Sequence, residues 1–147
     1  TSAILCNDFT WVQSFIPTKH QLTKIVLPIF KNNLIFSDVE LSIRKSLTGN
    51  DLAICSKSFK NISYKTMGLD WLISDFDDIS VQPGNSYFIV CKTKRGNRNV
   101  NFYSWLSSRS DEYEYGESWL SVDQGESWNS WYELNNVSFD FGFKTYF

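Results

Sequence analysis

Apolar and polar side chains alternate with a period of two along most of this chain, and no segment shows sustained helical spacing. In 38–45, DVELSIRK, the apolar residues Val39, Leu41 and Ile43 alternate with polar neighbours. The segment 137–144, VSFDFGFK, repeats the pattern. Successive side chains of a strand point to opposite faces, so both segments are predicted as β-strands with one buried face. The other predicted strands are 11–16, 22–30, 52–56, 69–76, 86–92, 100–106 and 117–122.

Polar turns rich in glycine and asparagine separate these segments. LTGND at 47–51, PGNS at 83–86 and RGNRN at 95–99 supply residues that adopt a positive φ at low cost. About nine short strands divided by such turns are typical of an antiparallel sandwich or barrel. We therefore predict an all-β fold, an antiparallel jelly-roll β-sandwich of about nine strands, over a single domain 1–147.

The composition narrows the class of protein. The 147 residues carry a net charge of −2, which disfavours a nucleic-acid-binding protein. No apolar run reaches the roughly 18 residues of a membrane-spanning helix, and no stretch of the 147 residues has the pattern of a secretion signal. We therefore expect no membrane span and a domain that is part of a longer protein. Cys6, Cys55 and Cys91 lack the spacing of a zinc site or a disulfide framework. The oligomeric state stays open.

Several stretches of the chain resemble a known group of modules. They are QSFIP at 13–17, LTKIVLPI at 22–29, DVELSIRKSLTGNDL at 38–52, DISVQPGNSYFIV at 78–90 and DFGFKTYF at 140–147. Together they look like prokaryotic secreted jelly-roll modules, which resemble carbohydrate-binding modules and sit beside catalytic, protease or adhesin domains. The resemblance implies an extracellular or cell-surface location, a non-catalytic accessory role and often a structural calcium ion.

We place the calcium expectation on Asp140. Alternation in 137–144 puts this carboxylate on the face opposite the phenylalanines, and the modules that the chain resembles often hold calcium near their joined termini. Calcium takes several oxygen ligands, so Asp140 needs partners, for which Asp8 and Asp38 are the candidates. The alternative is an edge carboxylate in water.

The segment 121–128, SVDQGESW, fits the pattern Ser-x-Asp-x-Gly-x-x-Trp, which is known from sialidases as the Asp-box. We predict a hairpin in which Asp123 accepts hydrogen bonds from the turn, Gly125 takes a conformation that other residues resist, and Trp128 folds back over the turn. Sialidases resemble this chain only in that box, which they repeat around a propeller and away from the active site. They also clamp their substrate with several arginines, whereas this chain has four in all.

The segment 102–132 is rich in aromatic and acidic residues and contains one basic residue, Arg109. Sugar rings have apolar C–H faces and polar edges, so aromatic rings beside carboxylates suit a glycan. The predicted ligand-binding residues are Arg109, Asp111, Tyr113, Tyr115, Trp119, Trp128, Trp131 and Tyr132. For Trp119, and for Trp105 in the same segment, the alternative is a place in the core.

The sequence gives little indication of a catalytic site. His20 is the only histidine, and it lies in the polar segment TKHQ without a nucleophile motif. The carboxylates in 111–133 show no separation or pKa contrast that would select a glycosidase pair. The basic residues in 92–98 form either a solvated turn or a contact for an anionic partner.

We therefore predict a non-catalytic extracellular binding module, not an enzyme, that binds carbohydrate through the aromatic and acidic surface of 102–132. A structural or adhesion module that packs against another domain or protein is the first alternative. A small glycosidase is the second. The expected partners are thus a glycan or a neighbouring domain.

Overall fold

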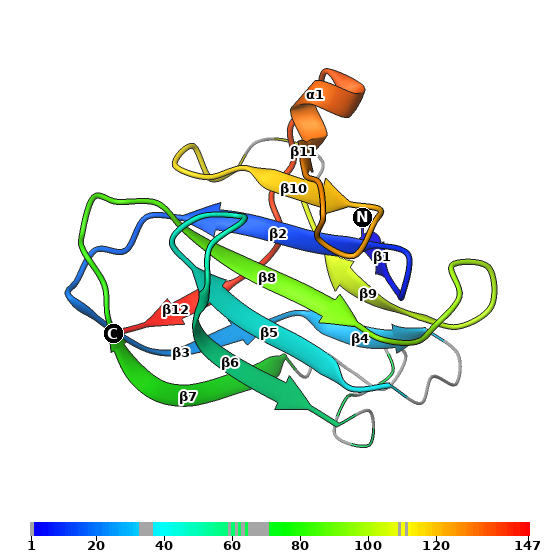
Figure 1. Ribbon diagram of the computed structural model, residues 1–147, viewed down its shortest axis with the longest axis horizontal. Coiled ribbons are helices and arrows are strands. Elements are labelled where there is room, and N and C mark those ends of the chain that lie inside the picture. Colours follow the sequence, from blue (N-terminus) through cyan, green and yellow to red (C-terminus); the bar gives the residue numbers. More distant parts are fainter. Residues whose placement is uncertain are drawn as a thin grey trace.

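The computed structural model describes residues 2–32, 37–58, 60, 62, 64, 71–108, 110 and 112–147. These residues form twelve β-strands and one short helix, α1 (Trp131–Asn135), as Figure 1 shows. The predicted all-β class with antiparallel sheets is confirmed, and the architecture is consistent with a β-sandwich. The jelly-roll order of strands stays a prediction. The described part of the chain contains no helix long and apolar enough to cross a membrane.

Six strands form the larger sheet. In spatial order they are β11 (Asn129–Ser130), β10 (Ser118–Ser121), β2 (Thr10–Phe15), β8 (Tyr87–Thr93), β5 (Val39–Arg44) and β6 (Asp51–Lys57). Each strand pairs antiparallel with its neighbours. The strand β2 lies inside this sheet and is buried along its whole length.

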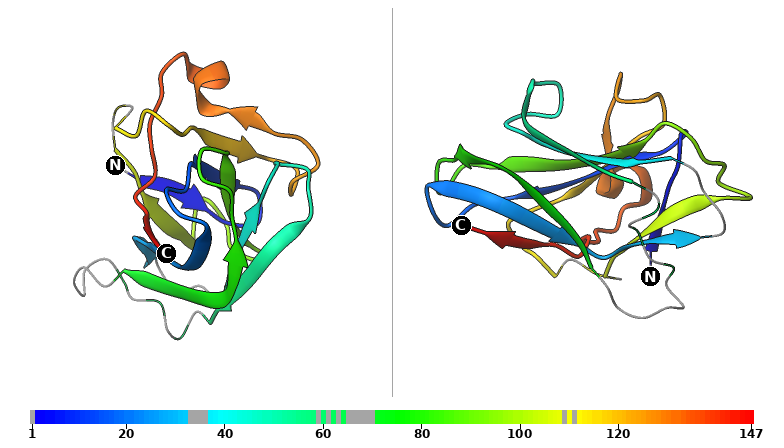
Figure 2. Two further views of the ribbon diagram at one scale, coloured as in Figure 1. Left: turned by 90° about the vertical axis from the view of Figure 1, so that its left-hand side faces the viewer. Right: turned by 90° about the horizontal axis from the view of Figure 1, so that it is seen from below.

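Two three-stranded sheets form the opposite layer (Figure 2). One contains β1 (Ser2–Leu5), β9 (Phe102–Leu106) and β4 (Ile29–Asn32); the other contains β12 (Lys144–Tyr146), β3 (Gln21–Leu27) and β7 (Leu72–Ser80). Pro28 separates β3 from β4, because proline has no N–H for a strand ladder. The predicted strand 22–30 is therefore wrong as one strand, since it forms parts of two sheets.

Side chains from both layers fill the space between the sheets. Phe15 and Tyr87 of the larger sheet and Trp105 of the smaller layer are almost completely buried. The ring of Trp105 stacks on that of Phe141, with centroids 4.0 Å apart. The alternative that placed Trp105 in the core is confirmed.

The predicted strand 137–144 is wrong for most of its length. Only Lys144–Tyr146 forms a strand, β12, and Phe141 makes an isolated bridge. Val137, predicted on the buried face, is 58% exposed, whereas Asp140, predicted on the solvent face, is 5% exposed. Strict alternation therefore fails at both of these positions.

The buried side chain of Gln13, on β2, explains this departure. Its Oε1 accepts a hydrogen bond from Phe141 N at 2.8 Å, and its Nε2 donates to Asp140 Oδ1 at 3.1 Å. The second carboxylate oxygen, Asp140 Oδ2, accepts from Tyr113 N at 2.6 Å. The side chain of Gln13 thus satisfies the backbone N–H of Phe141, which a neighbouring strand would satisfy in a regular sheet.

Replacing Gln13 with leucine is expected to lower the free energy of unfolding by about 2–4 kcal/mol, because a buried N–H and a buried carboxylate each lose a partner. Chemical denaturation measured by tryptophan fluorescence checks this. Gln82→Leu is the control, since the side chain of Gln82 is exposed and its change should stay within about 0.5 kcal/mol. Equal effects of the two substitutions would contradict the role given to Gln13.

Candidate functional site

Two cavities open beside the end of β9, and Ser107 and Ser108 line both of them. The first cavity has a volume of about 480 Å³ and the second of about 560 Å³. Both volumes lie in the range of small-molecule sites in proteins. These two cavities are therefore candidate binding sites, and each is lined by one of the aromatic residues that the sequence analysis associates with a ligand.

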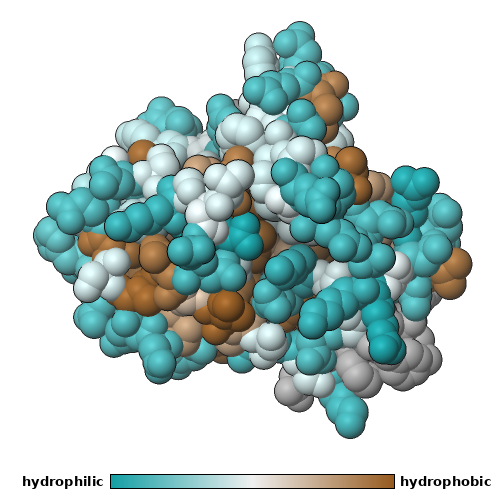
Figure 3. All heavy atoms as spheres, in the orientation of Figure 1, coloured by the Kyte–Doolittle hydropathy of each residue, from teal (hydrophilic) through white to brown (hydrophobic). Residues whose placement is uncertain are grey.

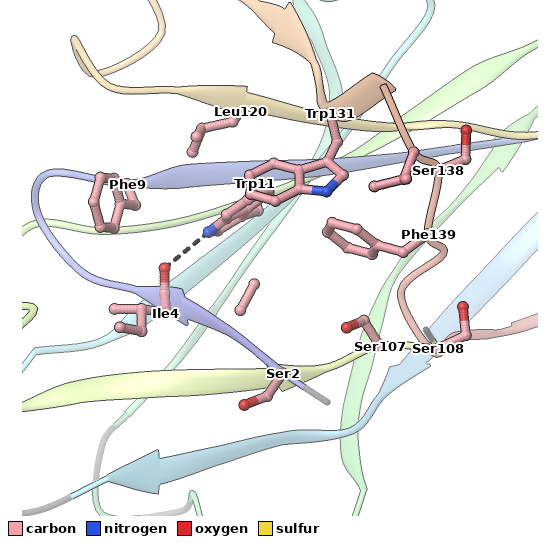
Figure 4. Close-up of a pocket in the computed structure, with 12 residues that line it drawn as sticks. Ser2, Ile4, Phe9, Trp11, Ser107, Ser108, Leu120, Trp131, Ser138 and Phe139 are labelled. Carbon is pink, nitrogen blue, oxygen red and sulfur yellow. Dashed lines mark hydrogen bonds between the residues drawn. The ribbon is translucent and has the colours of Figure 1, made fainter. Parts of the chain in front are cut away.

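Aromatic rings from separate parts of the chain form the wall of the first cavity (Figure 4). Trp11 comes from β2, and Phe9 comes from the turn that precedes it. Trp131 and Phe139 approach from the C-terminal part, with ring centroids 5.4 Å apart. The Trp11 centroid lies 5.4 Å from that of Trp131 and 5.9 Å from that of Phe139. With Leu120 of β10, these rings give the cavity an apolar wall.

A capping box positions Trp131 as the first residue of α1. Ser130 Oγ accepts from Glu133 N at 3.1 Å, and Glu133 Oε2 accepts from Ser130 N at 3.3 Å. Asn136 ends the helix in the left-handed region, with φ of 57°. The Ser-x-x-Glu spacing is visible in the sequence, but a helix of five residues is too short to show helical periodicity.

Two of the polar side-chain groups at the first cavity, those of Trp11 and Ser108, are engaged within the protein. The indole Nε1 of Trp11 donates to Ile4 O at 2.8 Å. Ser108 Oγ accepts from Asp140 N at 3.1 Å and donates to the carbonyl oxygen of Ser110. Among the described residues that line this cavity, none has a charged side chain. The first cavity is therefore neutral and mainly apolar over that lining.

The second cavity combines aromatic rings with a carboxylate. Trp71, Tyr113 and Phe143 line it together with the exposed Glu112. The rings of Tyr113 and Phe143 meet edge to face, with centroids 5.3 Å apart. Lys144 Nζ lies 4.5 Å from the centroid of the Trp71 ring. This cavity consequently offers flat apolar faces, a hydrogen-bond acceptor and a nearby cation.

Asp140 also lines the second cavity, and its carboxylate accepts hydrogen bonds from Gln13 Nε2 and Tyr113 N. The partners predicted for a calcium ion are Asp8, in the turn between β1 and β2, and Asp38, directly before β5. No three histidine, cysteine or acidic residues gather into a metal-binding group within the described residues. Calcium at Asp140 stays a prediction.

Bound calcium is expected to raise the melting temperature, because a ligand that binds only the folded chain stabilises it by mass action. Thermal unfolding in EDTA and in millimolar calcium measures this effect. Asp140→Asn should abolish the difference between the two conditions, whereas Asp77→Asn, at an exposed position of β7, should preserve it. Equal midpoints of the unaltered protein in both conditions would refute the prediction.

The segment 121–128 forms the connection between β10 and β11. Asp123 Oδ1 accepts from Ser127 N at 2.9 Å, and Asp123 Oδ2 accepts from the hydroxyl of Ser127. These hydrogen bonds, first that of the hydroxyl, lower the pKa of Asp123 to about 2. Gly125 has φ of 92°, and the ring of Trp128 lies next to it. These contacts support an architectural role for Asp123.

Trp131 lines the first cavity and Tyr113 the second, so the structure brings two of the predicted ligand-binding residues to adjoining sites. Trp119 lies elsewhere. It alternates along β10 with Leu120, which faces the first cavity, so Trp119 faces away from the core and is half-buried.

The remaining predicted ligand-binding residues that the structure describes belong to neither cavity lining. Tyr115 and Tyr132 are 59% and 54% exposed. Trp128 packs within its hairpin. Arg109 and Asp111 lie outside the described residues. The aromatic segment 102–132 is thus divided among several places rather than gathered at one site.

Six aromatic residues that line the cavities were missed by sequence reasoning: Phe9, Trp11, Trp71, Phe139, Phe141 and Phe143. Trp71 and Phe143 are far apart in the sequence, and only the fold makes them line the same cavity. Alternation marked Phe139 and Phe143 as apolar strand residues but gave no sign that a cavity lies beside them.

No protein-family model matches this sequence, and a search of curated proteins also finds no match. The function is therefore argued from the fold and from the two cavities.

Replacing Asp123 with alanine is expected to lower the melting temperature near neutral pH, because the hairpin loses a hydrogen-bond acceptor. The folded-state pKa of Asp123, about 2, lies below its ordinary value of 3.8. Its contribution is therefore fully present above the ordinary pKa and is lost as the pH falls through the folded-state pKa. The difference in melting temperature between the unaltered protein and Asp123→Ala should shrink between about pH 5 and pH 2.

Melting curves at several pH values measure this difference. Asp77→Ala, at an exposed position on β7, is the control and should change the melting temperature little at any pH. A constant difference for Asp123→Ala down to pH 2 would contradict the expected linkage.

Proposed function

We propose that the protein is a non-catalytic binding module and that its ligand is a glycan held at the second cavity. The observation that carries this proposal is the combination of three aromatic rings, those of Trp71, Tyr113 and Phe143, with the carboxylate of Glu112 around one open cavity. An extracellular or cell-surface location, which the resemblance to secreted modules implies, belongs to the same proposal.

The chemistry of a sugar ring supports this ligand class. The C–H face of a sugar packs against a flat aromatic ring, and its hydroxyl groups need both acceptors and donors. Glu112 provides an acceptor at the lining, and the ammonium group of Lys144 lies 4.5 Å from the centroid of the Trp71 ring. Apolar faces next to such polar groups suit a sugar better than a purely apolar compound.

A non-catalytic role is supported by the surroundings of Asp140, the buried acidic residue of this cavity. Its carboxylate accepts hydrogen bonds from Gln13 and from the backbone of Tyr113. These contacts hold the C-terminal segment to β2. A glycosidase instead needs two carboxyl groups that both face the glycosidic bond. Because the Asp140 carboxylate is engaged in these contacts, we do not propose it as a catalytic partner of Glu112.

Screening the folded chain against a panel of glycans, followed by calorimetric titration of the best ligand, tests the proposal. Trp71→Ala is expected to weaken binding by about 30-fold, which corresponds to about 2 kcal/mol for a central aromatic contact. Glu112→Gln should weaken it by a smaller factor. Trp119→Ala is the matched control, because Trp119 lies on the outer face of β10 and its loss should leave the affinity unchanged. Absence of any saturable glycan binding would refute the proposal.

A packing module remains the second candidate, and exposed apolar residues on β6 and β7 favour it. Leu52 and Ile54 of β6, an edge strand, and Ile73 of β7 are all exposed. Figure 3 shows hydrophobic side chains on the face where β6 lies. Such side chains are suited to contact with another domain or protein. Glycan screening separates the two candidates, because a packing module gives no saturable sugar binding.

A further inference from the structure

The first cavity differs from the proposed glycan site in its chemistry. The side chains that surround it come from β1, β2, β10, α1, the segment 137–139, Phe9 before β2, and Ser107 and Ser108 after β9 (Figure 4). Its polar side chains among the described residues are serines, and none of those residues is charged. A charged ligand would lose its hydration there without gaining an opposite charge from these residues.

Hydrogen bonds within the protein engage two of the polar groups at this lining. The N–H of Trp11 is bonded to Ile4 O, so the largest polar group on the β2 side is already satisfied. Ser108 Oγ is bonded to the backbone of Asp140 and of Ser110. Water in such a cavity finds few partners, which favours its displacement by an apolar ligand.

The volume and the walls indicate the shape of this ligand. An apolar cavity of about 150 Å³ accepts benzene, and the first cavity, with about 480 Å³, is roughly three times larger. Trp11 and Trp131 are inclined at 52°, and Trp131 and Phe139 at 69°. Inclined rings offer a guest both faces and edges, and this combination suits stacked and edge-to-face contacts with a flat aromatic molecule.

We propose that the first cavity is a binding site for a neutral aromatic molecule of two or three fused rings. The ligand lies against the wall that Trp131, Trp11 and Phe139 form, and the hydroxyl of Ser107 takes its polar substituent. This site is independent of the proposed glycan function, because the aromatic residues that line the two cavities are different.

Calorimetric titration of the whole chain with 2-naphthol tests the proposal. The expected result is saturable binding of one molecule per chain with a negative heat-capacity change, the signature of apolar burial. Naphthalene-2-carboxylate, of similar shape but charged, should bind at least about tenfold more weakly. 1-Octanol should also bind more weakly, since a flexible chain cannot stack on the rings. Equal binding of 2-naphthol and either comparison compound would overturn the proposal.

Two variants locate the binding. Ser138→Trp adds a large ring at the lining and should weaken 2-naphthol binding at least tenfold, whereas Ser80→Trp, at the exposed end of β7, should leave it unchanged. Trp131→Ala removes part of the wall and should weaken binding even if Ser138→Trp fails to fold, and melting curves check that each variant is folded. Unchanged binding to a folded Trp131→Ala variant would overturn the assignment.

The Trp71→Ala variant separates the two proposals. Trp71 lines only the second of the two cavities, so its loss should reduce glycan binding and leave 2-naphthol binding unchanged. A loss of 2-naphthol binding in this variant would place the aromatic ligand in the second cavity and overturn the inference. Failure of glycan binding alone would leave the aromatic site supported.

Discussion

The buried amide of Gln13 fixes the C-terminal part of the chain against the sandwich. A buried polar side chain must form hydrogen bonds, or its desolvation destabilises the fold. Gln13 forms them with Phe141 N and the Asp140 carboxylate, which lie 128 and 127 residues further along the chain. Asp140 in turn accepts from Tyr113 N, so the same cluster holds the loop before β10. One polar side chain on β2 therefore sets the position of two distant segments.

Both cavities follow from that position. Phe139, on one side of Asp140, enters the wall of the first cavity, and Phe143 lines the second. Phe141, between them, stacks on Trp105 and closes the core. Because Gln13 holds the segment by its backbone and one carboxylate, the phenylalanines remain available to line cavities rather than to pair in a regular sheet. The hydrogen bonds of Gln13 thus stabilise the fold and also shape the candidate sites.

The alternation of apolar and polar residues predicted strands correctly where ordinary strand pairing determines the structure. Alternation placed β5 within 38–45, and the observed strand is Val39–Arg44. The same pattern failed in 137–144, because a contact with Gln13 replaced strand pairing there. Composition predicted aromatic ligand residues, yet only the fold shows that Trp71 and Tyr113 share a cavity. The types of residue that form the sites could thus be predicted from the sequence. Which of them lie together could not, because that depends on contacts between residues far apart in the chain.

The two cavities also show that residue type alone does not set the chemistry of a site. Tryptophan lines both, but in the first cavity the indole N–H of Trp11 is engaged with a backbone carbonyl. In the second, Trp71 lies beside the cation of Lys144 and the exposed carboxylate of Glu112. The Glu112 carboxylate accepts a hydrogen bond from Ser110 Oγ at 2.7 Å, so groups at both cavities are bonded within the protein. The two cavities therefore differ mainly in charge, because charged groups lie at the second, whereas the described lining of the first has none.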